Sequence, residues 1–298
     1  MGQIHQASSV LGWELVPGSF GKGSLGESYR INSASFRGPE QLLGRRSGIN
    51  RIMVIGDSFT FGMGVNLDDT YPKQLEQILN RKGIACEVIN CGVIYYQMWQ
   101  YYEVLKRKVI PYQPDLVIVG LFADDLAESI PPYKQQERYE GHNPFDSKGE
   151  SGVMSYFSLW NFCKNADALF KYRYRYRTSG ERGYLKSIEN RKKNLGAGHK
   201  HNIWKIMSGE IKQDKSIAFS ETLQDFAKTA KHQGIEVLIA LIPDSIQLND
   251  PHLQVMNGFV DQVCSENGIS FIDLTPFLEA EKDHLSLYLF PYDAHNSP

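Results

Sequence analysis

Short apolar segments alternate with amphipathic ones along this sequence, and the alternation restricts the fold more than any other feature does. Five segments are rich in β-branched and other apolar residues, as buried parallel strands are: 51–56, 85–92, 115–122, 235–243 and 269–274. Four segments have helical periodicity: 70–83, 98–110, 219–233 and 251–267. Repeated strand, helix and strand with short links predict a parallel sheet covered by helices on both faces. We therefore expect an α/β fold of the doubly wound, flavodoxin-like type, a three-layer sandwich with a parallel five-stranded sheet.

The ends of the predicted helices carry residues that favour such ends. Asp69 or Thr70 can cap the first helix, and Pro72 lies in its first turn, where a missing N–H is tolerated. Three helices should stop at glycines, which are typical of helix C-termini: Gly83, Gly234 and Gly268. The boundaries therefore support the assignment of strands and helices.

Two regions do not follow the alternation. Residues 1–48 are rich in glycine and serine with little periodicity, and we interpret them as an extended lead-in on the surface of the domain. Residues 131–215 are polar, basic and interrupted by glycine, so we expect an inserted helical or loop segment, or a lid. Within it, residues 171–193 hold nine lysines and arginines and two glutamates, which form a solvated face or contact an anionic polysaccharide or phospholipid. With these additions, residues 1–298 are expected to form one domain.

Composition excludes several classes of protein. The 298 residues are 42% hydrophobic and carry a net charge of -2, so a sizeable core is expected and nucleic acid is not an expected partner. The longest apolar runs are shorter than the ~20 residues that cross a membrane, so no membrane span is predicted. The N-terminal residues show no signal-peptide pattern, which leaves open a cytoplasmic location or export with a leader; the oligomeric state is open too. The four cysteines fit buried apolar positions: Cys86, Cys91, Cys163 and Cys264.

Candidate chemistry lies where the predicted strands end, because turns at the carboxyl edge of a parallel sheet direct backbone N–H groups into a crevice. The segment GDSFTFG, residues 56–62, directly follows the first strand. Gly56 permits a tight turn, Asp57 can accept backbone N–H groups within it, and Ser58 lies at the strand tip as a candidate nucleophile. The alternative is a helix-capping turn with an ordinary serine.

Two further places carry polar residues of this kind. Asp293 and His295 are two residues apart, so in an extended loop the carboxylate can hold the imidazole as a base. A serine hydroxyl needs such a base to become a nucleophile. After the third strand, Asp124 and Asp125 form a carboxylate pair. The alternative for His295 is a solvated histidine in a surface loop, and the alternative for the carboxylate pair is a helix start with acidic residues. A third possibility is a metal site built on Asp57, Asp124, Asp125 and His295.

Taken in chain order, these residues resemble the SGNH/GDSL hydrolase family. The segment 56–58 is similar to the nucleophile block, whose serine also supplies one backbone N–H to an oxyanion hole. Gly92, at the end of NCG, is similar to the glycine block that supplies the second N–H. Asp293 and His295 are similar to the last block, which completes a Ser-His-Asp triad.

The resemblance spans residues 11–128 and 219–298 and includes departures. In the lead-in, GWELVPGS and INSASFRG resemble bacterial members, but Ser35 stands where a glycine is expected. Asp124 stands where the family has an asparagine that donates to the oxyanion, and an ionised carboxylate cannot donate. The sequence ends three residues after His295, without the closing helix of the family, so we expect a mobile histidine loop.

The resemblance implies a serine esterase or O-acyltransferase that cleaves or transfers O-acyl groups, those of carbohydrates among them. Ser58 would attack the acyl carbonyl, with His295 as base and Asp293 orienting it. The oxyanion would be held by the backbone N–H groups of Ser58 and Gly92, and the side chain at position 124 would face it as well. No metal or organic cofactor is required, and the partner is a small-molecule or polysaccharide acyl ester. The alternative is a catalytically weak or inactive module that keeps the crevice to bind a glycan.

Aromatic residues follow the glycine block: Tyr95, Tyr96, Trp99, Tyr101 and Tyr102. Their rings could line the crevice and stack on a sugar or an acyl chain. The helical spacing favours the other interpretation, in which the rings form the buried face of a helix.

Overall fold

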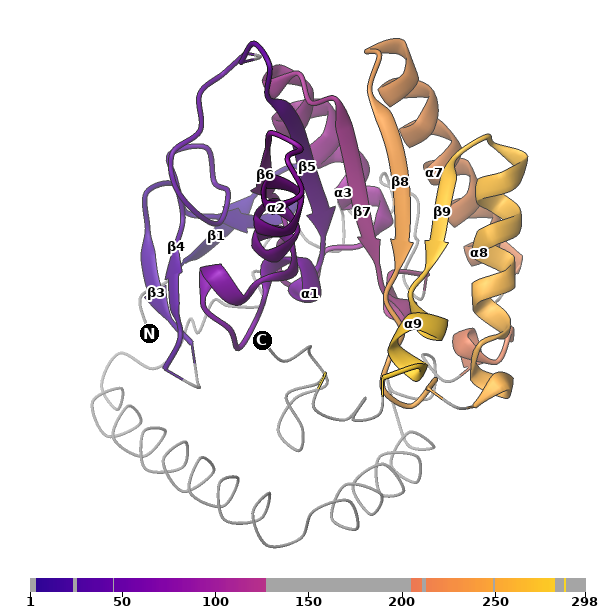
Figure 1. Ribbon diagram of the computed structural model, residues 1–298. Helices are drawn as coiled ribbons and strands as arrows, with labels where there is room; N and C mark the ends of the chain where they lie inside the picture. Colours follow the sequence, from indigo (N-terminus) through magenta and orange to yellow (C-terminus); the bar gives the residue numbers. More distant parts are fainter. Residues whose placement is uncertain are drawn as a thin grey trace, which may run out of the picture.

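The computed structural model of the chain describes residues 4–23, 26–44, 46–126, 205–210, 213–248, 250–281 and 287. Its centre is a five-stranded parallel sheet in the order β6-β5-β7-β8-β9 (Figure 1). The strands are β5 (Asn50–Gly56), β6 (Cys86–Asn90), β7 (Leu116–Leu121), β8 (Glu236–Leu241) and β9 (Ser270–Asp273). All five strands expected from the sequence are present, and their order is that of a flavodoxin-like sheet. The predicted fold class is confirmed.

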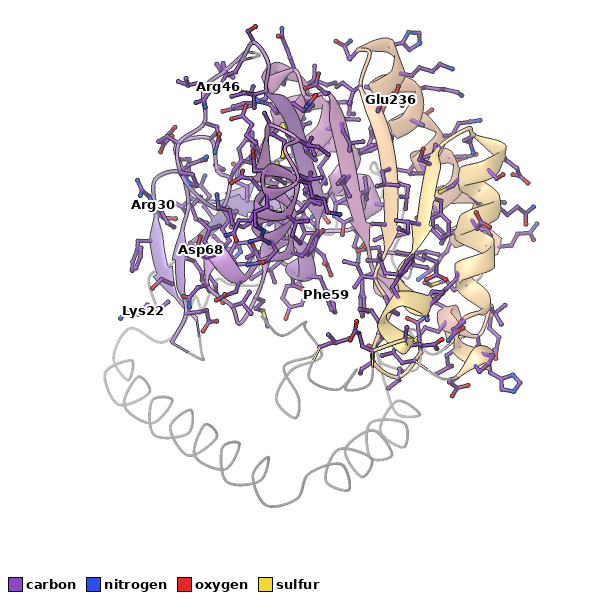
Figure 2. All side chains as sticks on the ribbon, in the orientation of Figure 1. Lys22, Arg30, Arg46, Phe59, Asp68 and Glu236 are labelled. Carbon is purple, nitrogen blue, oxygen red and sulfur yellow. The ribbon has the colours of Figure 1, made fainter. Side chains whose placement is uncertain are left out.

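The central strands end together at one edge of the sheet. Gly56 of β5 lies opposite Gly120 of β7, which lies opposite Ala240 of β8. Because the strands are parallel, this edge collects the loops that follow their carboxyl ends. It is the lower edge in Figure 2, where Phe59 is labelled, whereas Glu236 marks the start of β8 at the upper edge.

Helices cover both faces of the sheet. They are α1 (Ser58–Phe61), α2 (Tyr71–Arg81), α3 (Met98–Val104), α7 (Gln213–His232), α8 (Val255–Glu266) and α9 (Thr275–Glu279). Shorter helical turns are η1 (Leu67–Asp69), η2 (Leu105–Val109), η3 (Ile110–Tyr112), η4 (Ala123–Leu126) and η5 (Pro251–Leu253). Residues of α3, α7 and α8 join one face of the sheet in the main core, and α2 packs on the other face. In Figure 1, α2 lies in front of the sheet and α3 and α7 lie behind it.

Most helix ends agree with the sequence. The glycines after α2, α7 and α8 have positive φ angles of 82°, 69° and 64°: Gly83, Gly234 and Gly268. Thr70 is the N-cap of α2, but its hydroxyl donates to Leu67 O (2.7 Å) and caps no helical N–H. Helix α7 begins at Gln213 and not near residue 219, because polar residues in its first turns hide the helical pattern.

The cysteines within the described residues are buried, as the sequence predicts. They carry free thiols: Cys86, Cys91 and Cys264. Burial raises the pKa of the Cys264 thiol to about 12, so little thiolate forms near neutral pH. Cys163 lies outside the described residues.

The lead-in is more regular than its sequence indicates. Its described residues form two antiparallel hairpins, β1 (His5–Ser8) with β2 (Gly12–Leu15) and β3 (Phe20–Lys22) with β4 (Ser28–Arg30). Strands of three or four residues are too short to show an alternating pattern. The sequence therefore predicts only an extended segment, and the pairing appears in the structure.

Buried side chains anchor the first hairpin to the segment that follows β6. The Trp13 indole N–H donates to Ile94 O (3.0 Å), and the Tyr96 hydroxyl donates to Trp13 O (2.6 Å). Gln100 Nε2 donates to Leu11 O (2.8 Å). These contacts join residues more than 80 positions apart, so the lead-in belongs to the main core.

Ser35 adopts a backbone conformation that a glycine would favour. Its φ is 63°, in the left-handed region. The surrounding turn is held by Asn32 Oδ1, which accepts from the backbone N–H groups of Ala34 and Phe36 (3.0 and 2.9 Å). A residue with a Cβ is disfavoured there by roughly 1–2 kcal/mol. The glycine expected at this position therefore has a physical reason.

Most of the predicted insertion, residues 131–215, lies outside the described residues, and so does the basic run 171–193. The single-domain organisation and the lid therefore stay predictions. Within the part of the chain that the structure describes, no helix is both long and apolar enough to cross a membrane.

Candidate active site

Ser58 lies in the turn between β5 and α1. Asp57 is the N-cap of α1, and its Oδ1 accepts from Phe59 N (2.9 Å), as expected for an aspartate in this turn. Ser58 is the first residue of the helix, and its hydroxyl donates to Asp57 Oδ2 over 3.4 Å. The exposed fraction of Ser58 is 8%. The serine is therefore held at the carboxyl end of a central strand, where the sequence places the nucleophile.

Three glycines make room for α1 at this edge. A Cβ on Gly92 would lie 2.3 Å from the backbone nitrogen of Phe61. A Cβ on Gly56 would lie 2.0 Å from Thr60 Oγ1, and one on Gly120 would lie 2.6 Å from the same atom. These distances exclude larger residues unless the helix moves. The close packing therefore fixes α1, and with it Ser58, against three strand ends.

Tyr71 supports this packing from α2. Its hydroxyl lies 2.7 Å from Thr60 Oγ1. Burial, followed by the negative charges of Asp57 and Asp125, raises the pKa of the Tyr71 phenol. The phenol therefore stays protonated near neutral pH and keeps this hydrogen bond. Neither Thr60 nor Tyr71 was predicted from the sequence; the available signal was the presence of glycines inside strands, which marks a close approach.

Gly92, the second expected oxyanion donor, lies beside the nucleophile turn. Val93 N donates to Gly56 O (2.9 Å), which attaches the glycine block to the end of β5. The Gly92 N–H donates to Asn90 Oδ1 (3.0 Å), and Asn90 Nδ2 donates to Thr60 O (2.7 Å). The position of Gly92 thus agrees with the sequence, while the role of its N–H stays a prediction.

The carboxylate of Asp125 braces the turn after β7. Its Oδ1 accepts from the Tyr101 hydroxyl (2.8 Å), and its Oδ2 accepts from Phe122 N (2.8 Å). Asp125 is buried, so these bonds give it a structural role. Asp124 belongs to the same turn, but its side chain lies outside the part that the structure describes. Its expected position at the oxyanion stays a prediction.

An apolar cluster adjoins the serine. The ring of Phe59, the residue after Ser58, stacks on Phe122 with the centroids 4.3 Å apart. Ile242, just after β8, completes the cluster. Figure 2 shows Phe59 at the carboxyl edge of the sheet. The serine turn therefore has apolar side chains from three strand ends beside it.

The aromatic residues after the glycine block divide into two groups. Tyr96, Trp99 and Tyr101 are buried, and Tyr102 is half-buried against Phe226. These four form the buried face of a helix and its approach, as the helical spacing predicts. Tyr95 differs: it is 62% exposed and has a φ of 65°.

A second Asp-Ser pair, which was not predicted as a candidate site from the sequence, follows β8. Asp244 Oδ1 accepts from Ile246 N (3.1 Å) and from the Ser245 hydroxyl (3.1 Å). The backbone N–H of Asp244 donates to Gln247 Oε1 (2.8 Å). Both members of the pair are buried. The signal in the sequence was the repetition of Asp-Ser after an apolar strand.

Asp293 and His295 lie outside the described residues. Their meeting with Ser58 in a triad therefore stays a prediction. The metal alternative depends on His295 and Asp124 as well. Among the residues that the structure describes, no three His, Cys, Asp or Glu side chains are grouped as metal ligands.

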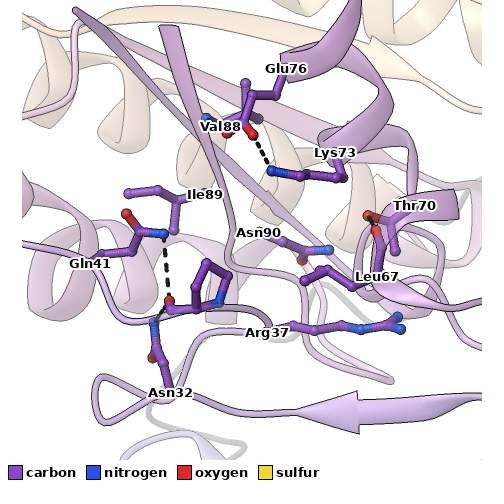
Figure 3. A pocket seen from close by; sticks show the side chains of 11 residues that line it. Asn32, Arg37, Gln41, Leu67, Thr70, Lys73, Glu76, Val88, Ile89 and Asn90 are labelled. Carbon is purple, nitrogen blue, oxygen red and sulfur yellow. Dashed lines mark hydrogen bonds and ion pairs between the residues drawn. The ribbon is translucent and has the colours of Figure 1, made fainter.

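A small cavity with a mixed polar and apolar lining lies between the lead-in, η1, α2 and β6 (Figure 3). Its volume is about 30 Å³, and its lining includes Arg37, Asn90 and the Lys73–Glu76 ion pair. Ser58 does not line it. A space of this size holds one or two water molecules. The cavity is therefore no substrate site, and the candidate site is assigned by the chemistry of the serine turn.

The fold and the serine turn together define an α/β protein with a doubly wound sheet and an Asp-Ser turn at the carboxyl edge of that sheet. Residues 54–298 match the profile of the GDSL-like lipase/acylhydrolase family. The chain belongs to this family, so the resemblance found in the sequence is confirmed. The match begins inside β5 and leaves out the lead-in.

Solved structures with a similar fold include TesA, which is 11% identical, with a TM-score of 0.46 and coverage of 83% of this chain and 89% of that one. AlinE4, an SGNH-hydrolase family esterase, is 14% identical, with a TM-score of 0.43 and coverage of 81% and 84%. A lipolytic protein of the G-D-S-L family from Desulfitobacterium hafniense is 14% identical, with a TM-score of 0.44 and coverage of 84% and 91%. At these identities the likeness concerns the fold alone. No curated protein sequence matches this chain.

Proposed function

We propose that the protein is a serine hydrolase that cleaves O-acyl esters, with Ser58 as its nucleophile. The observation that carries the proposal is the turn itself. Ser58 begins a helix directly after a central strand, Asp57 caps that helix, and three glycines hold it in place. Membership of the GDSL-like lipase/acylhydrolase family supports ester hydrolysis as the reaction.

In the proposed reaction, Ser58 Oγ attacks the ester carbonyl while His295 takes the hydroxyl proton. Asp293 orients the imidazole, which then protonates the departing alcohol as the tetrahedral intermediate collapses to an acyl-enzyme. Water, activated by the same imidazole, releases the acid and restores the serine. A second alcohol in place of water would give acyl transfer through the same intermediate.

The negative oxygen of the intermediate needs donors that are in place beforehand. The Ser58 backbone N–H, in the first turn of α1, is one proposed donor. The Gly92 N–H is the other, and it would share or release its bond to Asn90 Oδ1 as the oxyanion forms. Asp124, if ionised, would oppose the oxyanion, so the proposed site has fewer favourable contacts than one with asparagine there.

The proposed substrate is an ester with a short or moderate acyl group. Phe59, Phe122 and Ile242 form a buried apolar cluster beside the serine turn, which favours an apolar acyl group over a charged one next to Ser58. The alcohol side could be a carbohydrate, as the sequence suggests. A short p-nitrophenyl ester tests the reaction without requiring the natural alcohol.

The test is hydrolysis of p-nitrophenyl acetate by the full chain and two variants. Ser58→Ala and His295→Ala should each lower kcat/KM by about 1,000-fold or more, because each removes a member of the triad. Activity of the parent protein should persist in the presence of a chelator. An unchanged rate in Ser58→Ala would contradict the assignment of the nucleophile.

A further inference from the structure

The C-terminal end of α1 leaves backbone carbonyls that a four-residue helix cannot satisfy. A helix this short is unstable alone, because too few hydrogen bonds form for the residues that are fixed. The Ser58 carbonyl accepts from Gly62 N and Met63 N (2.9 and 3.0 Å). The carbonyls further along the turn need donors from elsewhere in the chain.

Arg37, in the lead-in, supplies most of those donors. Its Nη1 donates to Phe61 O and Gly62 O (2.5 and 2.6 Å), and its Nη2 donates to Val65 O (2.6 Å). The side chain is buried, with an exposed fraction of 3%. A single guanidinium therefore binds the end of the nucleophile helix and the loop after it.

Two aromatic rings hold the guanidinium, and a carboxylate fixes one of these rings. It lies over the ring of Tyr29 at 4.7 Å and over that of Phe61 at 4.9 Å. The Tyr29 hydroxyl donates to Glu27 and accepts from Gly64 N (3.1 Å). Burial lowers the pKa of Arg37 to about 10, and electrostatic interactions with Tyr29 and Glu27 oppose the shift. Arg37 therefore stays charged near neutral pH.

The backbone of Arg37 reaches the glycine block as well. Its N–H donates to Asn90 O (3.2 Å), and Asn90 Nδ2 donates to Thr60 O (2.7 Å). The same asparagine accepts from the Gly92 N–H. Arg37 thus contacts the nucleophile helix directly and the second proposed oxyanion donor through one residue.

We propose that Arg37 is a positioning residue for Ser58, and that the lead-in before the family domain thereby sets the reactivity of the nucleophile. The inference rests on the proposed function. Arg37 binds one end of α1 and Ser58 stands at the other, so release of the guanidinium lets the serine shift relative to the strand ends. Lysine cannot replace Arg37. The planar guanidinium donates to three carbonyls while it lies against two rings, and the single ammonium group of lysine cannot make all of these contacts.

Arg51 provides a matched control. It is also fully buried, at 1% exposed, and it lies on β5, at the amino end of the strand that leads to Ser58. Its Nε pairs with Glu87 (2.7 Å), and its Nη1 donates to Tyr112 O (2.5 Å). An Arg51→Lys variant therefore loses comparable buried contacts at the edge of the sheet away from the serine.

The experiment measures the rate at which a fluorophosphonate labels Ser58 in the full chain, in Arg37→Lys and in Arg51→Lys. It is run at a temperature where near-ultraviolet circular dichroism shows each protein folded. We expect Arg37→Lys to slow labelling roughly 10- to 100-fold, the effect of a displacement of about 1 Å at a reacting group. The labelling rate of Arg51→Lys should stay within about twofold of that of the parent protein, even if its Tm falls as much as that of Arg37→Lys.

The kinetic constants separate positioning from a general loss of stability. For p-nitrophenyl acetate, Arg37→Lys should lower kcat with little change in KM. Should Arg37→Lys fail to fold, Tyr29→Phe keeps both rings and removes the hydroxyl that fixes Glu27 and Gly64; it should slow labelling by about threefold.

Each outcome decides one question. Equal labelling of the parent protein and Arg37→Lys, or equal slowing in Arg37→Lys and Arg51→Lys, would overturn the positioning role. If Arg37→Lys does not fold and Tyr29→Phe does, a labelling rate of Tyr29→Phe equal to that of the parent protein would overturn the positioning role. A parent protein that the reagent does not label would contradict the proposed function itself, independently of Arg37.

Discussion

Two Asp-Ser turns follow strands of the same sheet, and the two serines have different surroundings. Asp57 and Asp244 each accept from the backbone N–H two residues later, and each accepts from the hydroxyl of the following serine. The sequence and the local hydrogen bonds are therefore nearly the same. The two turns differ in the structure that the chain forms after each serine.

Ser58 begins a helix that packs against glycines from three strand ends, and it is 8% exposed. Ser245 begins a turn that Gln247 closes: its Oε1 accepts from Asp244 N, and its Nε2 donates to Leu253 O (2.8 Å). Ser245 is 1% exposed. The same Asp-Ser turn is thus followed by different packing at the two places, and the helix and the greater exposure at Ser58 are the reasons why we propose it, and not Ser245, as the nucleophile.

The largest expected difference lies between the two serine variants. Ser58→Ala should lose about 1,000-fold or more of p-nitrophenyl acetate hydrolysis, whereas Ser245→Ala should keep at least about half of the parent rate. Steady-state kinetics on both purified variants check this. Equal losses would mean that the two turns do not differ in their importance for hydrolysis.

The next largest effect tests the glycine packing. Gly92→Ala should lower activity by about 100-fold and cost roughly 1–3 kcal/mol of unfolding free energy, because its Cβ would meet the backbone of α1. Gly258→Ala is the control: it lies in α8 with no atom within 4 Å of its Cβ, so it should stabilise slightly. Kinetics and denaturant unfolding check both. Full activity in Gly92→Ala would show that close packing is unimportant.

Asp124→Asn tests whether the Ser58 site lacks an oxyanion donor. The amide can donate where an ionised carboxylate cannot, so kcat near neutral pH should rise by about tenfold. Asp68→Asn, at an exposed position in η1, is the control and should leave kcat unchanged. Equal or lower activity in Asp124→Asn would give the carboxylate another role.

The smallest expected effect concerns the lead-in that holds α1. Ser35→Gly removes the strain of a residue with a Cβ in the left-handed region, but it also adds conformational freedom to the unfolded chain. The net effect should be a gain of about 0.5 kcal/mol in the free energy of unfolding. Ser47→Gly, at an exposed turn without a positive φ, should lose a similar amount. Chemical denaturation resolves the two. A stabilised Ser47→Gly with a destabilised Ser35→Gly would contradict this account of the turn.

The sheet and the serine turn could be predicted because their signals are local. Apolar strand runs, glycine stops and the GDS segment each lie within a few residues, and the structure has them where the sequence places them. The role of Arg37 could not be predicted, because its acceptors are backbone carbonyls 24 to 28 residues away that carry no sequence signature. The orientation of the Gly92 N–H toward Asn90 depends on the conformation of a turn, which side-chain types do not specify.

The most direct test of the central claim is a fluorophosphonate reaction with the full chain, followed by peptide mapping. The account predicts one adduct for each chain, on the peptide that contains Ser58, with the Ser245 peptide unmodified. No adduct, or an adduct on Ser245 in place of Ser58, would contradict it.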